Sequence, residues 1–161
     1  VLQVVEADSE LAMMITFLVV FLVVLLDFRK FSEAILVMAS LTAALLWVAG
    51  IMHAGGLRFD LYNIVVFPTI AGMGIVNAVH ILHRYREEGR RSLSLVLGTT
   101  GKAVAATTLT TMAGFSGLVL VRHPGLNSMG LLALIGLAWC FISAGALLPA
   151  ILQARERKPG S

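Results

Sequence analysis

Long stretches without a charged residue constrain this chain more than any other feature. Five stretches lack Asp, Glu, Lys and Arg, namely residues 11–26, 34–57, 61–83, 103–121 and 123–154. A helix needs about 20 mostly apolar residues to cross a hydrocarbon core about 30 Å thick. The pattern therefore predicts an all-α integral membrane protein with five transmembrane helices. We expect the spans at about 9–27, 33–53, 61–83, 102–121 and 128–152.

The composition fits a membrane protein and excludes several other classes. Hydrophobic residues make up 58% of the chain and charged residues 13%, against about 25% charged in soluble domains. The small basic excess lies in the connections between the apolar stretches, so we expect no nucleic-acid partner. A single cysteine, Cys140, provides neither a disulfide framework nor a set of zinc ligands, and we expect no metal or cofactor. Glu6, Asp8 and Glu10 precede the first charge-free stretch, which is not typical of a signal peptide and favours a piece of a longer protein.

Basic residues are distributed unequally over the predicted connections, and this predicts the orientation. Ten follow the first, third and fifth spans, whereas two, Arg58 and Arg122, follow the second and fourth. Lys and Arg are enriched in short loops on the cytoplasmic side of a membrane. We therefore expect the N-terminus outside the cytoplasm and the C-terminus inside it.

The connection between the third and fourth spans is strongly charged at first and then alternates between polar and apolar residues. This pattern predicts a short amphipathic helix over about residues 86–98, lying in the inner headgroup layer. A solvated charged turn is the alternative. We expect one transmembrane domain over residues 1–158, followed by a tail at 159–161.

The third span carries unusual residues for a membrane helix. Pro68 lacks the backbone N–H that would bond to Ile64, so we expect a kink there. Gly72 and Gly74 follow, and small residues of this kind let another helix backbone approach closely. Asn77 lies well inside the span, either as a simple packing residue that bonds to a neighbouring helix or as part of a functional polar cluster.

The fourth span carries a group of hydroxyl residues. They are Thr107, Thr108, Thr110 and Thr111, and Gly114 and Gly117 follow them as expected packing positions. Asn77 and Thr107 each lie about 7–8 Å to the cytoplasmic side of the membrane midplane, given a rise of 1.5 Å per residue. Asn77, Thr107, Thr108 and Thr111 therefore form a candidate polar relay or substrate path, although membrane threonines often bond only to their own helix.

One histidine and one serine motif are considered as candidates for chemistry. His80 lies one turn beyond Asn77 and is a candidate member of the polar relay, with an interfacial anchor as the alternative. Gly114-Phe-Ser-Gly117 matches a motif of intramembrane serine proteases, which would require a histidine on a later helix to accept the serine proton. The one histidine after Ser116 is His123, in a predicted outer loop, so we do not expect an enzyme.

Two blocks of this sequence resemble the resistance-nodulation-division (RND) superfamily. The first, Pro68–Glu88, reads PTIAGMGIVNAVHILHRYREE and resembles the fourth helix of these transporters. The second comprises Thr107-Thr-Leu-Thr-Thr111, Gly114-Phe115, His123-Pro-Gly-Leu-Asn-Ser-Met-Gly130 and Leu148-Pro149. Within this superfamily the sequence is most similar to the branch that exports lipids, which includes the mycobacterial-membrane-protein-large and hopanoid transporters. The chain resembles helices two to six of one half of such a transporter, and it is more similar to the second half than to the first. These five helices form a unit that is related to sterol-sensing domains.

This resemblance implies export of a sterol-like or hopanoid-like lipid across the inner membrane of a bacterium. It also implies partners, namely the other half of the transporter, its periplasmic domains and further copies in an oligomer. The family motif Gly-x-Gly-x-Asp carries the proton on its Asp, but here Val76 stands at that position. We therefore expect a half without the usual proton relay. A non-transporting sterol-sensing module that binds lipid is the main alternative.

Overall fold

The computed structural model describes residues 2–55, 61–89 and 92–157, with side chains except at residues 2–10, 61–64 and 157. Every regular element within these ranges is helical, which confirms the predicted all-α class. The α-helices are α1 (Leu2–Phe28), α2 (Phe31–Ala54), α3 (Leu61–Glu88), α4 (Leu93–Val96), α5 (Lys102–Val119), α6 (Pro124–Ile142) and α7 (Leu148–Arg157). Two π-helical segments, η1 (Leu97–Gly101) and η2 (Ser143–Leu147), connect α4 to α5 and α6 to α7.

Four helical segments of the described chain are long and apolar enough to cross a membrane. They are Leu11–Phe28, Phe31–Ala54, Val65–Glu88 and Pro124–Glu156. Large apolar side chains point outward from them and their connections, with Leu26 76% and Leu120 85% exposed, as expected for a surface in contact with lipid. The helix α5 is not among the four, because Lys102 and four threonines make it more polar. A fifth crossing therefore stays a prediction.

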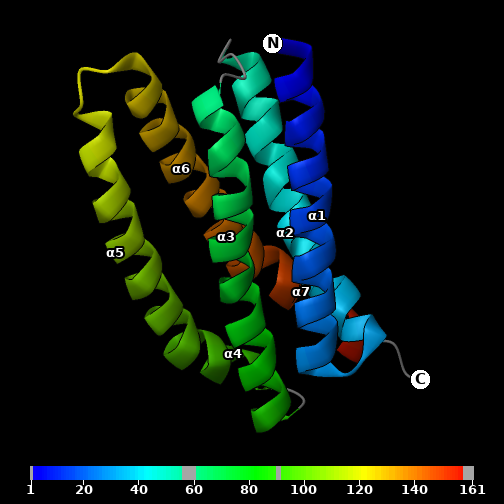
Figure 1. Ribbon diagram of the computed structural model, residues 1–161. Coiled ribbons are helices and arrows are strands. Elements are labelled where there is room, and N and C mark those ends of the chain that lie inside the picture. The colour runs from blue at the N-terminus through cyan, green and yellow to red at the C-terminus, as the bar shows by residue number, and fades with distance from the viewer. Residues whose placement is uncertain (1, 56–60, 90–91, 158–161) are drawn as a thin grey trace.

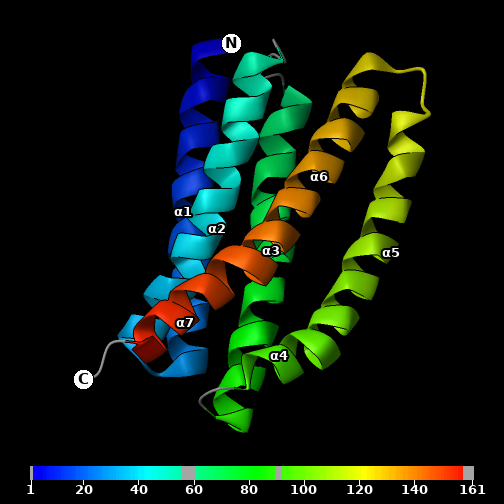
Figure 2. The same cartoon turned by 180° about the vertical axis from the view of Figure 1, so that it is seen from behind.

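The helix α3 occupies the middle of the bundle and packs against α1, α2 and α6 (Figure 1). On α2, the buried residues Val37, Leu41, Ala44, Val48 and Met52 recur every three or four positions, so they form one face towards the core. Viewed from behind, α5 and α6 form a hairpin, and α7 continues from α6 towards the end of the bundle where α2 begins (Figure 2). The helix α5 packs mainly on α6.

Glycines allow close approach at three contacts between helices. A β-carbon at Gly74 of α3 would lie 2.8 Å from the β-carbon of Cys140 on α6. At Gly136 a β-carbon would meet Ile70, and at Gly130 it would lie 2.9 Å from the backbone nitrogen of Val119. Gly74 was expected as a packing position, whereas Gly130 and Gly136 were not singled out.

The structure contradicts the bounds of the predicted interfacial helix, about residues 86–98, because the short helix between α3 and η1 is α4, Leu93–Val96. Its position in the headgroup layer stays a prediction. Residues up to Glu88 belong to α3, whose exposed end is supported by ion pairs from Arg84 to Glu87 and Glu88 at 3.0 and 2.6 Å. Gly89 ends α3 in the left-handed conformation, with φ of 83°, and its N–H bonds to the Tyr85 carbonyl. The chain from Leu93 onwards runs through η1 directly into α5.

The last long helix begins earlier than predicted. We expected its start near Ser128, but α6 begins at Pro124 and the Asn127 N–H already bonds to the His123 carbonyl at 3.0 Å. Proline is favoured in the first turn of a helix, because its missing N–H has no helical partner there in any case. The expected tail at 159–161 lies outside the described residues.

Candidate functional site

The predicted contact between Asn77 and the threonine face of the fourth span is present. Asn77 of α3 and Thr108 of α5 are both buried, and the Asn77 amide Nδ2 donates a hydrogen bond to Thr108 Oγ1 at 3.3 Å. An amide in a medium without water must find partners inside the protein. This bond explains how Asn77 is tolerated and fixes the facing sides of α3 and α5 at this level.

A cavity of about 200 Å³ surrounds this hydrogen bond between α3, α5 and α6. Its lining consists of Met73, Val76, Asn77, Thr107, Thr108, Thr111 and Leu137. Most of the candidate cluster, together with Val76, therefore borders one small space with both polar and apolar lining residues. Val76 is 44% exposed, so its side chain also reaches the outer surface of the bundle.

The other threonines of α5 bond to their own helix, as the alternative interpretation expected. Thr107 donates to the Val104 carbonyl at 3.0 Å, and Thr111 donates to the Thr107 carbonyl at 2.9 Å. Thr110 does the same towards Ala106. A hydroxyl that donates in this way keeps lone pairs that can still accept a bond from a group in the cavity.

His80 lies outside this cavity, and some of the predicted packing glycines are not at close contacts between helices. His80 is exposed and does not line the cavity, and its side chain forms no hydrogen bond within the described part of the chain. Gly72, Gly114 and Gly117 have open space where a β-carbon would be, so they are not close-packing positions here. Pro68 lies inside α3, and the helix continues through it.

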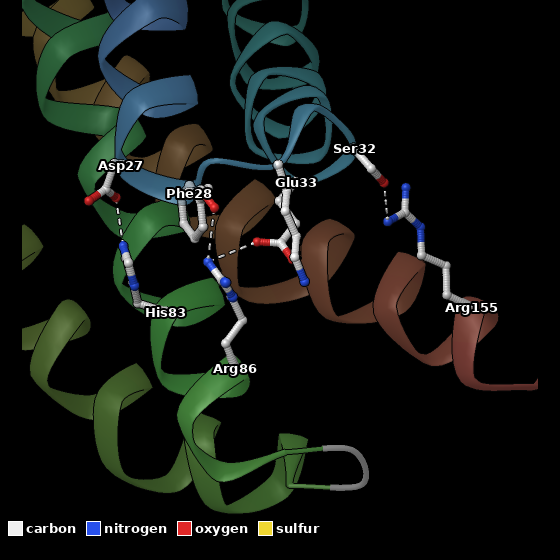
Figure 3. A network of polar contacts seen from close by, with 8 residues as sticks. Asp27, Phe28, Ser32, Glu33, His83, Arg86 and Arg155 are labelled. Atoms are coloured by element: carbon white, nitrogen blue, oxygen red, sulfur yellow. Dashed lines mark hydrogen bonds and ion pairs between the residues drawn. The ribbon is translucent and has the colours of Figure 1, made fainter. Parts of the chain in front are cut away.

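A polar network at the end of the bundle where α1 ends and α2 begins was not anticipated from the sequence (Figure 3). His83 of α3 stacks on Phe28 and lies 2.6 Å from the Asp27 carboxylate of α1. Arg86 lies over the Phe28 ring and pairs with Glu33 of α2 at 3.1 Å. The sequence feature that could have predicted this network is the placement of Asp27 and Glu33 on either side of the turn formed by Arg29 and Lys30.

A second buried contact joins α2 to the π-helical segment η2. Ser143 donates to the Ser40 carbonyl at 2.6 Å, and the two hydroxyl oxygens lie 3.1 Å apart. Both serines are buried. Nothing in the local sequence distinguishes them from serines that bond to their own helix, so this contact was also missed.

Among the described residues, no side chains are arranged as a nucleophile with its base or as a set of metal ligands. Ser116 donates to the Ala113 carbonyl at 2.6 Å, and His123 lies beyond the end of α5. No cluster of three or more His, Cys, Asp or Glu side chains is placed to hold a metal in the described ranges. Long apolar helices with polar side chains gathered between them define a multi-pass membrane protein.

This chain belongs to the MMPL family, whose family model matches residues 1–158. The family comprises membrane transporters of the RND superfamily rather than enzymes, so the resemblance found in the sequence is confirmed at this level.

Three relatives illustrate the match. A membrane protein of Methanocaldococcus jannaschii, MJ1562, is 31% identical over 144 residues, which cover 86% of this chain and 37% of that protein. MmpL11 of Mycolicibacterium smegmatis, named as an exporter of mycolic acid-containing lipids, is 32% identical over 104 residues, or 58% of this chain. MmpL11 of Mycobacterium tuberculosis, named as a heme uptake protein, is 33% identical over 105 residues, or 59% of this chain.

The chain spans 37% of the archaeal relative and 11% of each MmpL11. No solved structure matches it.

Proposed function

We propose that this chain is a transmembrane module of an RND-type exporter of hydrophobic lipids. The observation that carries this proposal is the family match over residues 1–158, and it is supported by a small cavity with amide and hydroxyl groups beside Val76, the position where the resemblance predicts the proton carrier. The M. smegmatis relative is named as a lipid exporter. We extend that role to this chain, with a sterol-like or hopanoid-like substrate, and with the rest of the transporter as partner.

The proposed topology has five crossings, with the N-terminus outside and the C-terminus in the cytoplasm of a bacterial inner membrane. The ten-to-two distribution of basic residues supports this orientation. We take α5 as the fifth crossing, because its 18 residues extend about 27 Å beside α6. The Asn77–Thr108 bond supplies one internal partner for its polar side.

We further propose that this half lacks the proton relay of its family. Val76 stands where the family has its Asp, and none of the five charge-free stretches contains a carboxylate. A proton carrier must titrate within the membrane field in order to draw on the transmembrane potential. The amide and hydroxyls around the cavity do not titrate in the physiological range. The driving carboxylate would then belong to the other half.

The absent carboxylate also supports a second candidate, a sterol-sensing-type module that binds lipid and regulates a partner without transport. The two candidates differ in one measurable property. An exporter moves lipid in a proton-dependent way, whereas a regulatory module binds lipid and produces no flux.

The test is proton-dependent lipid efflux from vesicles that contain the complete transporter. We expect Asn77→Ala to retain efflux, and neutralisation of an intramembrane carboxylate in the other half to abolish it. The reverse result would overturn the inactive-half proposal and assign proton coupling to Asn77 and His80. Lipid binding with no efflux from the complete protein would favour the sterol-sensing alternative.

A further inference from the structure

A large cavity lies at the end of the bundle where α2 begins and where α3 and α7 end. Its volume is about 720 Å³, within the roughly 300–1,000 Å³ typical of small-molecule sites. The lining residues are Lys30, Ser32, Glu33, Leu36, Leu82, Tyr85, Arg86, Gly89, Leu152, Arg155 and Glu156. Figure 3 shows Ser32, Glu33, Arg86 and Arg155 reaching into this region from the three helices.

The cavity is apolar on one side and charged on the other. Leu36, Leu82 and Leu152 are 3%, 2% and 5% exposed and form its floor, one leucine from each helix. The charged side chains come from the first turn of α2 and from the last turns of α3 and α7. This arrangement suits a ligand with a charged head and an apolar continuation.

The charges of the cavity leave one cation without an acidic partner. The Glu33 carboxylate lies 3.7 Å from Lys30 Nζ and 3.1 Å from Arg86 Nη1. Glu156 accepts a hydrogen bond of 2.5 Å from the Tyr85 hydroxyl. Arg155 donates to the neutral Ser32 hydroxyl at 3.1 Å and pairs with no carboxylate among the described residues. Three cations against two carboxylates give these lining residues a net charge of +1, and Arg155 is the cation whose described partner is a neutral hydroxyl.

We propose that this cavity binds the phosphate headgroup of an anionic phospholipid, with Arg155 as its main ligand. The proposal rests on the proposed topology, which places this end in the inner headgroup layer, but it does not require transport. Basic side chains immediately cytoplasmic to a membrane helix attract anionic lipid headgroups. The Arg155 guanidinium can hold phosphate oxygens in a bidentate manner, with Ser32 as a second donor.

The experiment compares three probes on the purified protein in uncharged detergent micelles. They are short-chain dihexanoyl phosphatidylglycerol, dihexanoyl phosphatidylcholine and inorganic phosphate, and the readout is the apparent Kd. We expect saturable binding of the phosphatidylglycerol, with both other probes at least about tenfold weaker. Arg155→Gln should weaken phosphatidylglycerol binding by about tenfold or more, the change expected from one hydrogen bond to a charged group.

Lys102→Gln is the matched control, because Lys102 is exposed, carries the same charge and does not line the cavity. It should weaken binding by no more than about fivefold, the long-range share of one surface cation. Arg155→Lys keeps the charge but loses the bidentate geometry, so its apparent Kd should lie between those of the unchanged protein and Arg155→Gln. Equal losses for Arg155→Gln and Lys102→Gln would overturn the site, and equal affinity for inorganic phosphate would overturn the lipid as its ligand. Neither result depends on efflux, so the transport proposal is tested separately.

Discussion

The amide of Asn77 donates to the hydroxyl of Thr108 at 3.3 Å, across 31 residues of sequence and between two helices that run in opposite directions. The helix α5 packs chiefly on α6, so this bond is a specific link between α5 and the central helix α3. It also lies in the wall of the cavity that Val76 borders. The level of Val76, where the resemblance predicts a proton carrier, is therefore occupied here by a neutral polar pair.

The first prediction concerns the energy of this pair. Asn77→Ala and Thr108→Ala should each destabilise the protein modestly, and the double mutant should lose less than the sum. Hydrogen bonds of this kind within membranes contribute about 0.6 kcal/mol on average and rarely more than 2. The measurement is a double-mutant cycle of unfolding in detergent. Thr107→Ala serves as the control, because its hydroxyl bonds within α5, and it should be additive with Asn77→Ala. Additivity at Thr108 as well would contradict the contact.

The second prediction concerns Val76. Val76→Asp should destabilise the protein by about 2.5 kcal/mol, because a carboxylate would enter the membrane without a cationic partner. It should also produce no proton-coupled efflux in the complete transporter. Val76→Asn, which adds polarity without a charge, should cost less. Restored coupling in Val76→Asp would show that this half keeps a functional relay around the missing acid.

The third prediction concerns the contact between α3 and α6 at Gly74. Gly74→Ala should destabilise the protein by about 1–3 kcal/mol, because its β-carbon would overlap Cys140. Gly72→Ala, two residues away, should be nearly neutral, since nothing lies within 4 Å of its β-carbon. Cys140→Gly should rescue Gly74→Ala in part. Equal unfolding midpoints for Gly72→Ala and Gly74→Ala would contradict this packing.

The fourth prediction concerns α5, a long helix whose composition alone does not qualify it as a span. Single cysteines in a Cys140→Ser background should react with an impermeant reagent from outside at Gly55 and Arg122. Cysteines at Glu87 and Ser94 should react from the cytoplasm. Ser94 and Arg122 lie before and after α5, so their labelling from the same side would mean that α5 does not cross the membrane.

The sequence determined the class of fold and the level of the polar residues along each helix. Both follow from local features, since uncharged length predicts a membrane helix and position within it gives depth. Depth along the helix was therefore enough to match Asn77 with the threonines in height. The sequence also showed that Val stands at position 76, where the resemblance leads one to expect an Asp. The start of the interfacial helix was misplaced, because the ion pairs of Arg84 with Glu87 and Glu88 support an extension of α3 to Glu88, and the short helix α4 begins only at Leu93.

The tertiary structure decided which side of each helix meets a neighbour. In a membrane protein both the core and the lipid are apolar, so a helix sequence carries little signal about its rotation. That is why the packing of α5 against α3 selected Thr108 over Thr107, and why Gly74 is packed while Gly72 is open. The same reason applies to Ser40 and Ser143, which are 103 residues apart. The ion pair of Arg86 with Glu33 likewise depends on α3 and α2 meeting at one end of the bundle, a contact that no local pattern encodes.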